Sequence, residues 1–165
     1  MTLSDFATIG DLVSSAAVVA TLIFLALQVK QANLLARSQA RQRMVEHAQA
    51  ELYVWMDNPD LRQSYLPTSK LSEEMQSKLH FFLTGAMRQR EWEWFQFRDG
   101  VIKKDVYQAY HEVIALHLGI PRTRKWWATV GRIGFDPTFV AEVDSLLAAK
   151  PLVNYFADLR AFATE

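Results

Sequence analysis

The sequence contains no cysteine, so disulfides, thiolate metal sites and cysteine nucleophiles are excluded. Its 18 basic and 18 acidic side chains cancel, which leaves no overall charge to draw the chain to nucleic acid. It also lacks a phosphate-binding glycine loop, a nucleophile elbow, a dinucleotide-binding fingerprint, an internal repeat and any useful alternation of apolar and polar residues. These absences favour an all-helical protein without a cofactor or a nucleic-acid partner.

Glycine and proline are absent between Gly10 and Pro59. This segment is rich in alanine, leucine, glutamine, arginine and glutamate, which are good helix formers, whereas glycine and proline interrupt helices. The segment is therefore predicted to be one long helix.

Charged side chains are absent from Leu12 to Val29, and the stretch is mostly apolar. Its length of about 18 residues corresponds to roughly 27 Å of helix, close to the thickness of a bilayer's hydrocarbon core. The hydroxyls of Ser14, Ser15 and Thr21 can donate to carbonyls of the same helix, which lowers their cost in lipid. We expect a transmembrane helix. The alternative is a soluble all-helical regulatory or binding module with residues 12–29 as a buried central helix.

Lysine and arginine are absent before this stretch, whereas Lys30, Arg37, Arg41 and Arg43 follow it. Positive residues are retained on the cytoplasmic side of a membrane, so we expect the N-terminus outside and the remainder in the cytoplasm. A secretory signal peptide would have the opposite order of charge. The expected organisation is a membrane anchor over residues 1–30, a helical stalk over 31–58 and a cytoplasmic helical domain over 59–165.

The segment from Ala26 to Asn33 reads ALQVKQAN, and its specific residues are Gln28, Lys30, Gln31 and Asn33. It resembles a family of small bacterial proteins in which an apolar N-terminal helix continues into such a stretch, then into an arginine- and alanine-rich helix and an aromatic-rich helical domain. Where that family has a small hydroxyl residue after the asparagine, this chain has leucine. The resemblance implies a helical protein anchored in the bacterial inner membrane, and it implies no activity or catalytic residue.

A stripe of small and polar residues runs along one side of the predicted anchor. Its main members are Gly10, Ser14, Ala17, Thr21 and Gln28, and the alternating spacing of four and three continues through Phe24, Gln31, Leu35 and Ser38. Small residues let helices approach closely in lipid, and polar ones hydrogen-bond across the contact. The stripe predicts self-association into a homo-oligomeric scaffold, whose partners are further copies of the chain and membrane lipids. In one variant, the oligomer encloses a pore lined by Ser14, Thr21 and Gln28.

The far end of the long helix has an apolar face, which we expect to pack against the shorter helices that follow. This face consists of Val45, Ala48, Leu52, Trp55 and Met56. The polar cluster from Asp57 to Asp60 then ends the helix, and Pro59 is predicted to begin another one with Asn58 as its cap.

Capping residues and prolines predict the remaining helices. Either Ser69 or Ser72, the latter followed by two glutamates, is predicted to cap a helix that runs to Asp99. Further helices are expected over residues 105–118, over 137–149 and after 151, with a turn at the glycines at 131 and 134. The predicted fold class is all-α: a long N-terminal helix packed with a bundle of short C-terminal helices.

Charged residues near the middle of the chain suggest ion pairs rather than catalysis. Arg88 with Glu91, and Arg90 with Glu93, have the three-residue spacing of pairs on a helix surface. The two glutamates diverge on a helix, so they do not form an acid and base pair. His111 and His117 are six residues apart, where a zinc-binding helix needs four. We therefore expect no enzyme, no metal site and no small-molecule substrate.

The segment PRTRKWW combines basic and aromatic residues and is the best candidate for contact with a membrane interface or a partner. The side chains concerned are Arg122, Arg124, Lys125, Trp126 and Trp127. Tryptophan rings lie among lipid headgroups, and basic groups bind lipid phosphates. Single-stranded nucleic acid would use the same residue types, by stacking on the rings and by neutralisation of its phosphates. The alternative is that one tryptophan fills the core while the basic residues are solvated.

Overall fold

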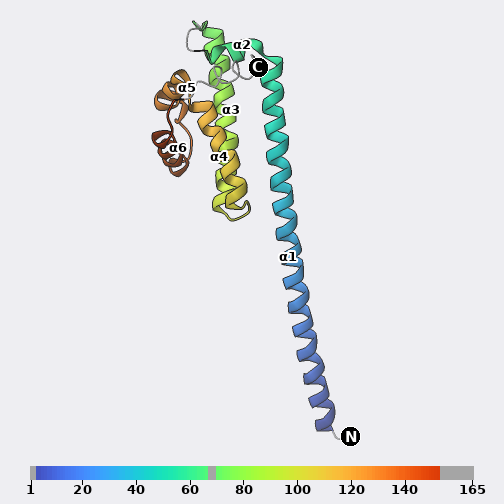
Figure 1. Cartoon of the computed structure of the whole chain (residues 1–165). Coiled ribbons are helices and arrows are strands. Elements are labelled where there is room, and N and C mark those ends of the chain that lie inside the picture. The colour runs from blue at the N-terminus through green and yellow to red at the C-terminus, as the bar shows by residue number, and fades with distance from the viewer. Residues whose placement is uncertain (1–2, 67–69, 153–165) are drawn as a thin grey trace, which may run out of the picture. The chain divides into compact units, whose positions relative to one another are not determined.

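The computed structural model of the chain describes residues 3–66 and 70–152, and the regular elements in these ranges are all helices (Figure 1). The predicted all-α fold class is confirmed. The chain divides into two units, Met1–Gln39 and Ala40–Glu165, which are described separately below. The helix predicted after Pro151 lies outside the described residues.

The described residues of the first unit belong to helix α1, Leu3–Asp57, which confirms the single long helix predicted here. Every side chain from Thr8 to Gln39 is exposed. The hydroxyl of Ser15 donates to the carbonyl of Asp11, and that of Thr21 to the carbonyl of Ala17, each at 2.8 Å. These two hydroxyls are therefore satisfied within the helix, as predicted.

Helices α2, Pro59–Ser64, and α3, Glu73–Arg98, begin where the sequence predicted. The Ser72 hydroxyl accepts from the backbone N–H of Met75 at 3.2 Å and so caps α3. Asn58 occupies the N-cap position of α2, as predicted, but its side chain makes no capping hydrogen bond, and its amide donates back to the carbonyl of Val54 at 2.9 Å. Helix α3 ends before Gly100, whose φ of +74° is a conformation that favours glycine.

The remaining helices are α4, Lys104–Leu118, α5, Pro121–Trp126, the π-helix η1, Trp127–Gly131, and α6, Pro137–Ala149. Asp136 caps α6 by accepting from the backbone N–H groups of Thr138 and Phe139. The turn predicted at Gly131 is instead the end of η1. A Cβ atom at Gly131 would lie 2.6 Å from the Trp126 ring, so this glycine serves close packing rather than a turn.

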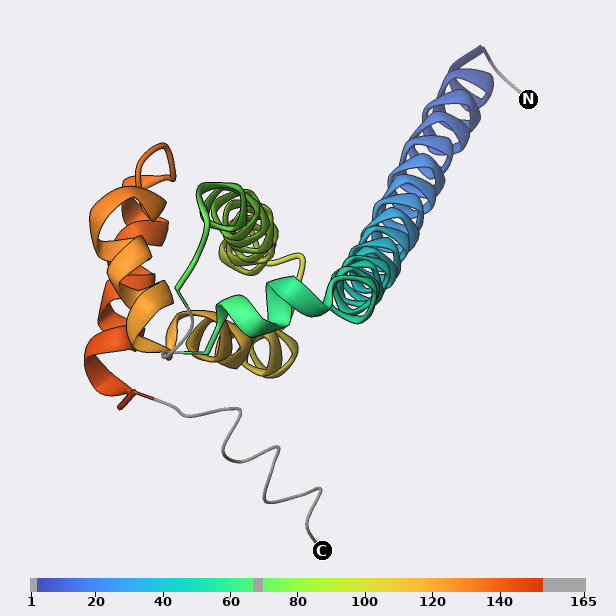
Figure 2. The ribbon, with the colours of Figure 1, turned by 90° about the horizontal axis from the view of Figure 1, so that it is seen from above.

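Two apolar clusters hold the second unit together. Helices α3 and α4 lie side by side in Figure 1, and Figure 2 shows α5, η1 and α6 gathered on one side of this pair. The larger cluster is centred on Trp127, Phe139 and Met87, and Ala40 and Met44 of α1 belong to it. The smaller cluster contains Leu61, Tyr65, Leu79, Leu83 and Ile120.

The face of α1 that packs in this unit differs from the predicted one. Ala40 and Met44 are buried and Glu51 is half-buried, whereas Val45, Leu52 and Met56 are exposed. Residues Ala48 and Trp55 of the predicted face are half-buried. The helix therefore packs through a neighbouring face and leaves most of its most apolar stripe uncovered.

Candidate functional site: a buried ion cluster

Arg90 lies on the core-facing side of α3, where its side chain is only 2% exposed. Its guanidinium nitrogen lies 3.2 Å from the carboxylate of Glu93, which is 1% exposed. The predicted pair of Arg90 and Glu93 is therefore present, but it lies in the interior rather than on the helix surface. The companion pair, Arg88 with Glu91 at 2.7 Å, is nearer the surface. A buried charge is energetically costly unless it is paired, so the partners of Arg90 make up the candidate site.

Glu51 from α1 and His117 from α4 complete the cluster. A carboxylate oxygen of Glu51 lies 2.6 Å from Nε2 of His117, without the alignment of a hydrogen bond, and the other lies 3.8 Å from Arg90. We call Glu51, Arg90, Glu93 and His117 the buried ion cluster. Sequence reasoning missed it because Glu51 and His117 are far apart in the chain, and no local spacing relates them.

The two carboxylates of the cluster have opposite pKa shifts. Burial raises the pKa of Glu93 to about 7, against the opposing effects of Arg90 and a hydrogen bond from Gln89. Burial also acts to raise the pKa of Glu51, but its contact and electrostatic interaction with His117 and the positive charge of Arg90 outweigh burial and lower the pKa. Glu51 is therefore the ionised partner of Arg90 and His117, whereas Glu93 exchanges a proton near neutral pH.

Several polar atoms at the cluster have no hydrogen-bond partner among the described residues. They are Nε of Arg90, Nδ1 of His117 and the hydroxyl of Tyr65. Burial raises the pKa of Tyr65 well above its ordinary value, and the charge of Glu51 acts in the same direction. The guanidinium also lies 5.8 Å from the centre of the Tyr110 ring, a cation–π distance. Arg90 therefore lies within reach of two carboxylates and one aromatic ring.

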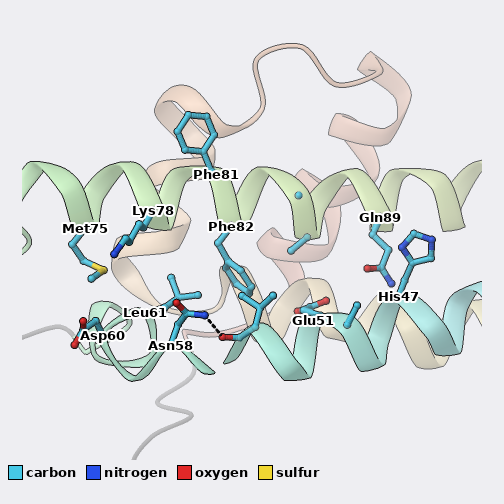
Figure 3. A pocket seen from close by; sticks show the side chains of 14 residues that line it. His47, Glu51, Asn58, Asp60, Leu61, Met75, Lys78, Phe81, Phe82 and Gln89 are labelled. Carbon is cyan, nitrogen blue, oxygen red and sulfur yellow. Dashed lines mark hydrogen bonds between the residues drawn. The ribbon is translucent and has the colours of Figure 1, made fainter. Parts of the chain in front are cut away.

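Two cavities adjoin the cluster, and Glu51 lines both. One, of about 540 Å³, lies between α1, α2 and α3, where Figure 3 shows Glu51, His47, Gln89 and Phe82 around it. The other, of about 370 Å³, is lined mainly by apolar side chains of α1 and α4, including Leu52, Val113 and Leu116. Glu51, Arg90 and His117 of the cluster also line this second cavity, together with Tyr65, and both volumes lie within the range of small-molecule sites.

The arrangement is suited to connecting helices through charged side chains. Glu91 is the carboxylate nearest to Glu93 in sequence. It accepts from the backbone N–H of Asp136 at 2.7 Å and therefore does not belong to the cluster. His111 lies 3.1 Å from Glu142. Among the described residues, no group of three or more histidine or carboxylate side chains is placed so that it could hold a metal ion. The cluster therefore joins α1, α3 and α4 through charge and holds one exchangeable proton.

The basic and aromatic segment is built largely into the second unit. Trp127 is buried and donates its indole N–H to Asp144 at 2.9 Å, while half-buried Trp126 donates to Nδ1 of His80 at 3.0 Å. Arg124 donates to the carbonyls of Leu118 and Lys150, Arg122 donates to that of Ser64, and Lys125 is exposed. One tryptophan therefore fills the core, and the two arginines bind carbonyl groups.

The predicted oligomer stripe lies in the first unit. Its residues, Gly10, Ser14, Ala17, Thr21 and Gln28, are exposed. The hydroxyl of Thr21 is already used by its own helix.

Comparison with protein-family models, with curated proteins and with solved structures gave no match for this chain.

Proposed function

We propose that this chain is a single-pass membrane protein that self-associates through its N-terminal helix and carries a helical unit at the membrane surface as a scaffold. The observation that carries the proposal is the stretch from Leu12 to Val29, which is apolar, free of charge and exposed along its whole length. Helix α1 is long and apolar enough to cross a membrane.

Exposure of this stretch is costly in water. Side chains such as Leu22, Ile23 and Phe24 are each more than half exposed. Burying one such side chain is worth about 1.5 to 3 kcal/mol, so a run of them in water would disfavour the folded chain strongly. In acyl chains the same surface has no such cost, and the satisfied hydroxyls of Ser15 and Thr21 add little. The excess of lysine and arginine after the stretch supports an outside N-terminus and a cytoplasmic second unit.

Cell fractionation tests the location. After lysis and ultracentrifugation, the protein is expected in the membrane pellet, and it should resist extraction with alkaline carbonate. Because the chain has no cysteine, single-cysteine variants at Ser4 and Gln108 also report orientation. Only the cysteine at position 4 should react with an impermeant maleimide from the outer side. A protein that stays in the supernatant would support the alternative, a soluble regulatory or binding module.

Cysteine cross-linking tests self-association through the stripe. Ala17 lies on the stripe, and Ala26, nine residues on, lies on the opposite side of the helix. Ala17→Cys should form a disulfide-linked dimer under mild oxidation in native membranes, whereas the matched variant Ala26→Cys should remain monomeric. Equal cross-linking at both positions, or none at either, would contradict assembly through the stripe.

A further inference from the structure

The spacing of the oligomer stripe does not stop at Ser38. It continues in alternating steps of four and three through Gln42, Val45, Gln49, Leu52 and Met56. Positions that repeat every 3.5 residues form the seam of a left-handed coiled coil, with two seam positions, a and d, in each heptad. Val45 and Leu52 take the d positions here, and Gln42, Gln49 and Met56 take the a positions. We call these five residues the distal seam.

The second unit leaves the distal seam uncovered. Val45 is 47% exposed, Leu52 62% and Met56 65%, and both glutamines are exposed as well. The contacts that α1 makes within this unit come from other positions, chiefly Ala40, Met44 and Glu51. Intrachain packing therefore uses one side of the helix and leaves the heptad seam free.

The glutamines of the distal seam favour one register and a small number of strands. A polar residue at an a position weakens a coiled coil, but it fixes the register and the oligomeric state. In a parallel pair in register, the Gln49 amides of the two copies would meet across the seam, where an amide can both donate and accept. A shift of one heptad would pair Gln49 of one copy with Gln42 of the other, but it would leave the second Gln49 against the apolar Met56. The polar positions therefore favour a parallel arrangement of two strands.

Charges beside the distal seam also suit a parallel partner. In a parallel coiled coil, the g residue of one helix meets the e residue five positions later in the other. Arg41 takes a g position and Glu46, five residues later, takes an e position. Both are exposed, and the amide of Gln42 donates to Glu46 at 2.8 Å. In two parallel copies, Arg41 of each helix would therefore lie next to Glu46 of the other helix.

The uncovered apolar surface extends from the distal seam onto α4. Leu52 lines the cavity of about 370 Å³ together with Trp55 and Leu116, and Leu116 is 39% exposed. A second helix on the distal seam would lie beside this cavity and cover part of its apolar rim. The surface is therefore larger than a single stripe of side chains.

We infer that residues 42–56 dock against the same residues of a second copy of this chain, as a parallel two-stranded coiled coil in the same heptad register as the anchor stripe. The inference rests on the proposed function, because copies inserted in one orientation must associate in parallel. Beyond the proposed function, it specifies the partner segment of the second copy, the heptad register, and the pairing of Arg41 with Glu46 that would fix this register. The scaffold would then be joined both along the anchor stripe and through residues 42–56.

Neighbouring positions provide a matched test in the full chain in native membranes. Gln49 lies on the distal seam, and Ala50 lies beside it, off the seam; both are exposed. A disulfide requires Cβ atoms about 4 Å apart, so Gln49→Cys should cross-link at least roughly tenfold faster than Ala50→Cys. Val45→Cys, at the preceding d position, should also cross-link faster than Ala50→Cys, and each product should have twice the mass of the chain. Equal rates on and off the seam, or a product with a different protein, would overturn the inference.

Charge exchange tests the register. Arg41→Glu and Glu46→Arg, each in the Gln49→Cys background, should slow cross-linking by roughly threefold or more, and the double exchange should restore it. Single exchanges without effect, or a double exchange that does not restore the rate, would overturn the assigned pairing. If Ala17→Cys cross-links but neither Val45→Cys nor Gln49→Cys does, the anchor assembles and the distal seam does not, so this inference alone fails. If none of the three cross-links, the proposed self-association fails as well.

Discussion

Glu51 on α1 lies 2.6 Å from His117 on α4, and this contact brings the last third of the long helix into the charged interior of the second unit. The same carboxylate also approaches Arg90 of α3. One side chain thus connects three helices that the sequence does not otherwise relate.

Removing the charge of Glu51 should destabilise the second unit. In Glu51→Gln, Arg90 and His117 remain buried with one fewer negative partner, and the loss of one member of a buried pair costs about 3 kcal/mol. Urea unfolding of the full chain in mild detergent, followed by tryptophan fluorescence, measures this loss. The control is Glu74→Gln, whose exposed pair with Lys78 is worth no more than about 0.5 kcal/mol. Equal midpoints for the two variants would contradict a stabilising role for the cluster.

Stability should fall as pH rises toward neutrality because of Glu93. Its pKa is about 7 in the folded protein against an ordinary value of 4.5, so the folded state binds more protons between these values. The favourable contribution is complete below the unfolded pKa and is lost as pH rises through the folded pKa, by up to about 3 kcal/mol. Thermal unfolding between pH 4.5 and 8 measures it.

Matched glutamine variants isolate this effect. Glu93→Gln removes the titrating group, so the slope of stability between pH 4.5 and 7 should flatten. Glu91→Gln, two residues away, should keep the slope, because Glu91 belongs to a separate contact with Arg88 and Asp136. An unchanged slope in Glu93→Gln would show that another group titrates.

Two glycine-to-alanine substitutions should have opposite effects. In Gly131→Ala, the new Cβ would lie 2.6 Å from the ring of Trp126, and the ring or the π-helix must move. Overpacking of this kind costs about 1 to 3 kcal/mol. In Gly85→Ala, the Cβ meets nothing within 4 Å inside α3, so helix propensity should stabilise the protein by up to about 1 kcal/mol. Melting temperatures of the two variants provide the comparison, and a tolerated Gly131→Ala would contradict the close packing.

A charge in the middle of the anchor should oppose membrane insertion. Ala20→Asp places a carboxylate near the centre of the apolar stretch, at a cost of about 2.5 to 3.5 kcal/mol. The fraction of protein in the membrane pellet should fall, whereas Asn33→Asp, beyond the stretch, should leave it unchanged. Equal pelleting of the two variants would argue against a transmembrane position for Ala20.

Local signals in the sequence predicted where the helices begin and end. Ser72, one of the two expected caps, caps α3, and prolines open α2 and α6. These features depend on a few neighbouring residues, so they can be predicted without knowledge of the packing. The helices of the segment from Pro121 to Gly131 were missed, because a ring stacked over a glycine has no sequence signature.

Tertiary features were predicted less well. Of the apolar face predicted to pack on α1, only Ala48 and Trp55 are half-buried, and the helix also packs through Ala40, Met44 and the charged Glu51. Hydrophobicity alone selects the most apolar stripe, whereas the observed face is set by buried charges on α3 and α4 that need a partner. The pairing of Arg90 with Glu93 was predicted from spacing, and its burial was not, since spacing does not tell which side of a helix is covered.

The raised pKa of Glu93 has a calorimetric consequence. At pH 7 this carboxyl is about half protonated in the native chain and ionised in the unfolded one, so unfolding releases about half a proton to the buffer. The apparent enthalpy of unfolding then contains the buffer's own heat of protonation. Unfolding at pH 7 in phosphate and in imidazole should therefore give two different apparent enthalpies. Their difference, divided by the difference between the protonation enthalpies of the two buffers, gives the number of protons released on unfolding.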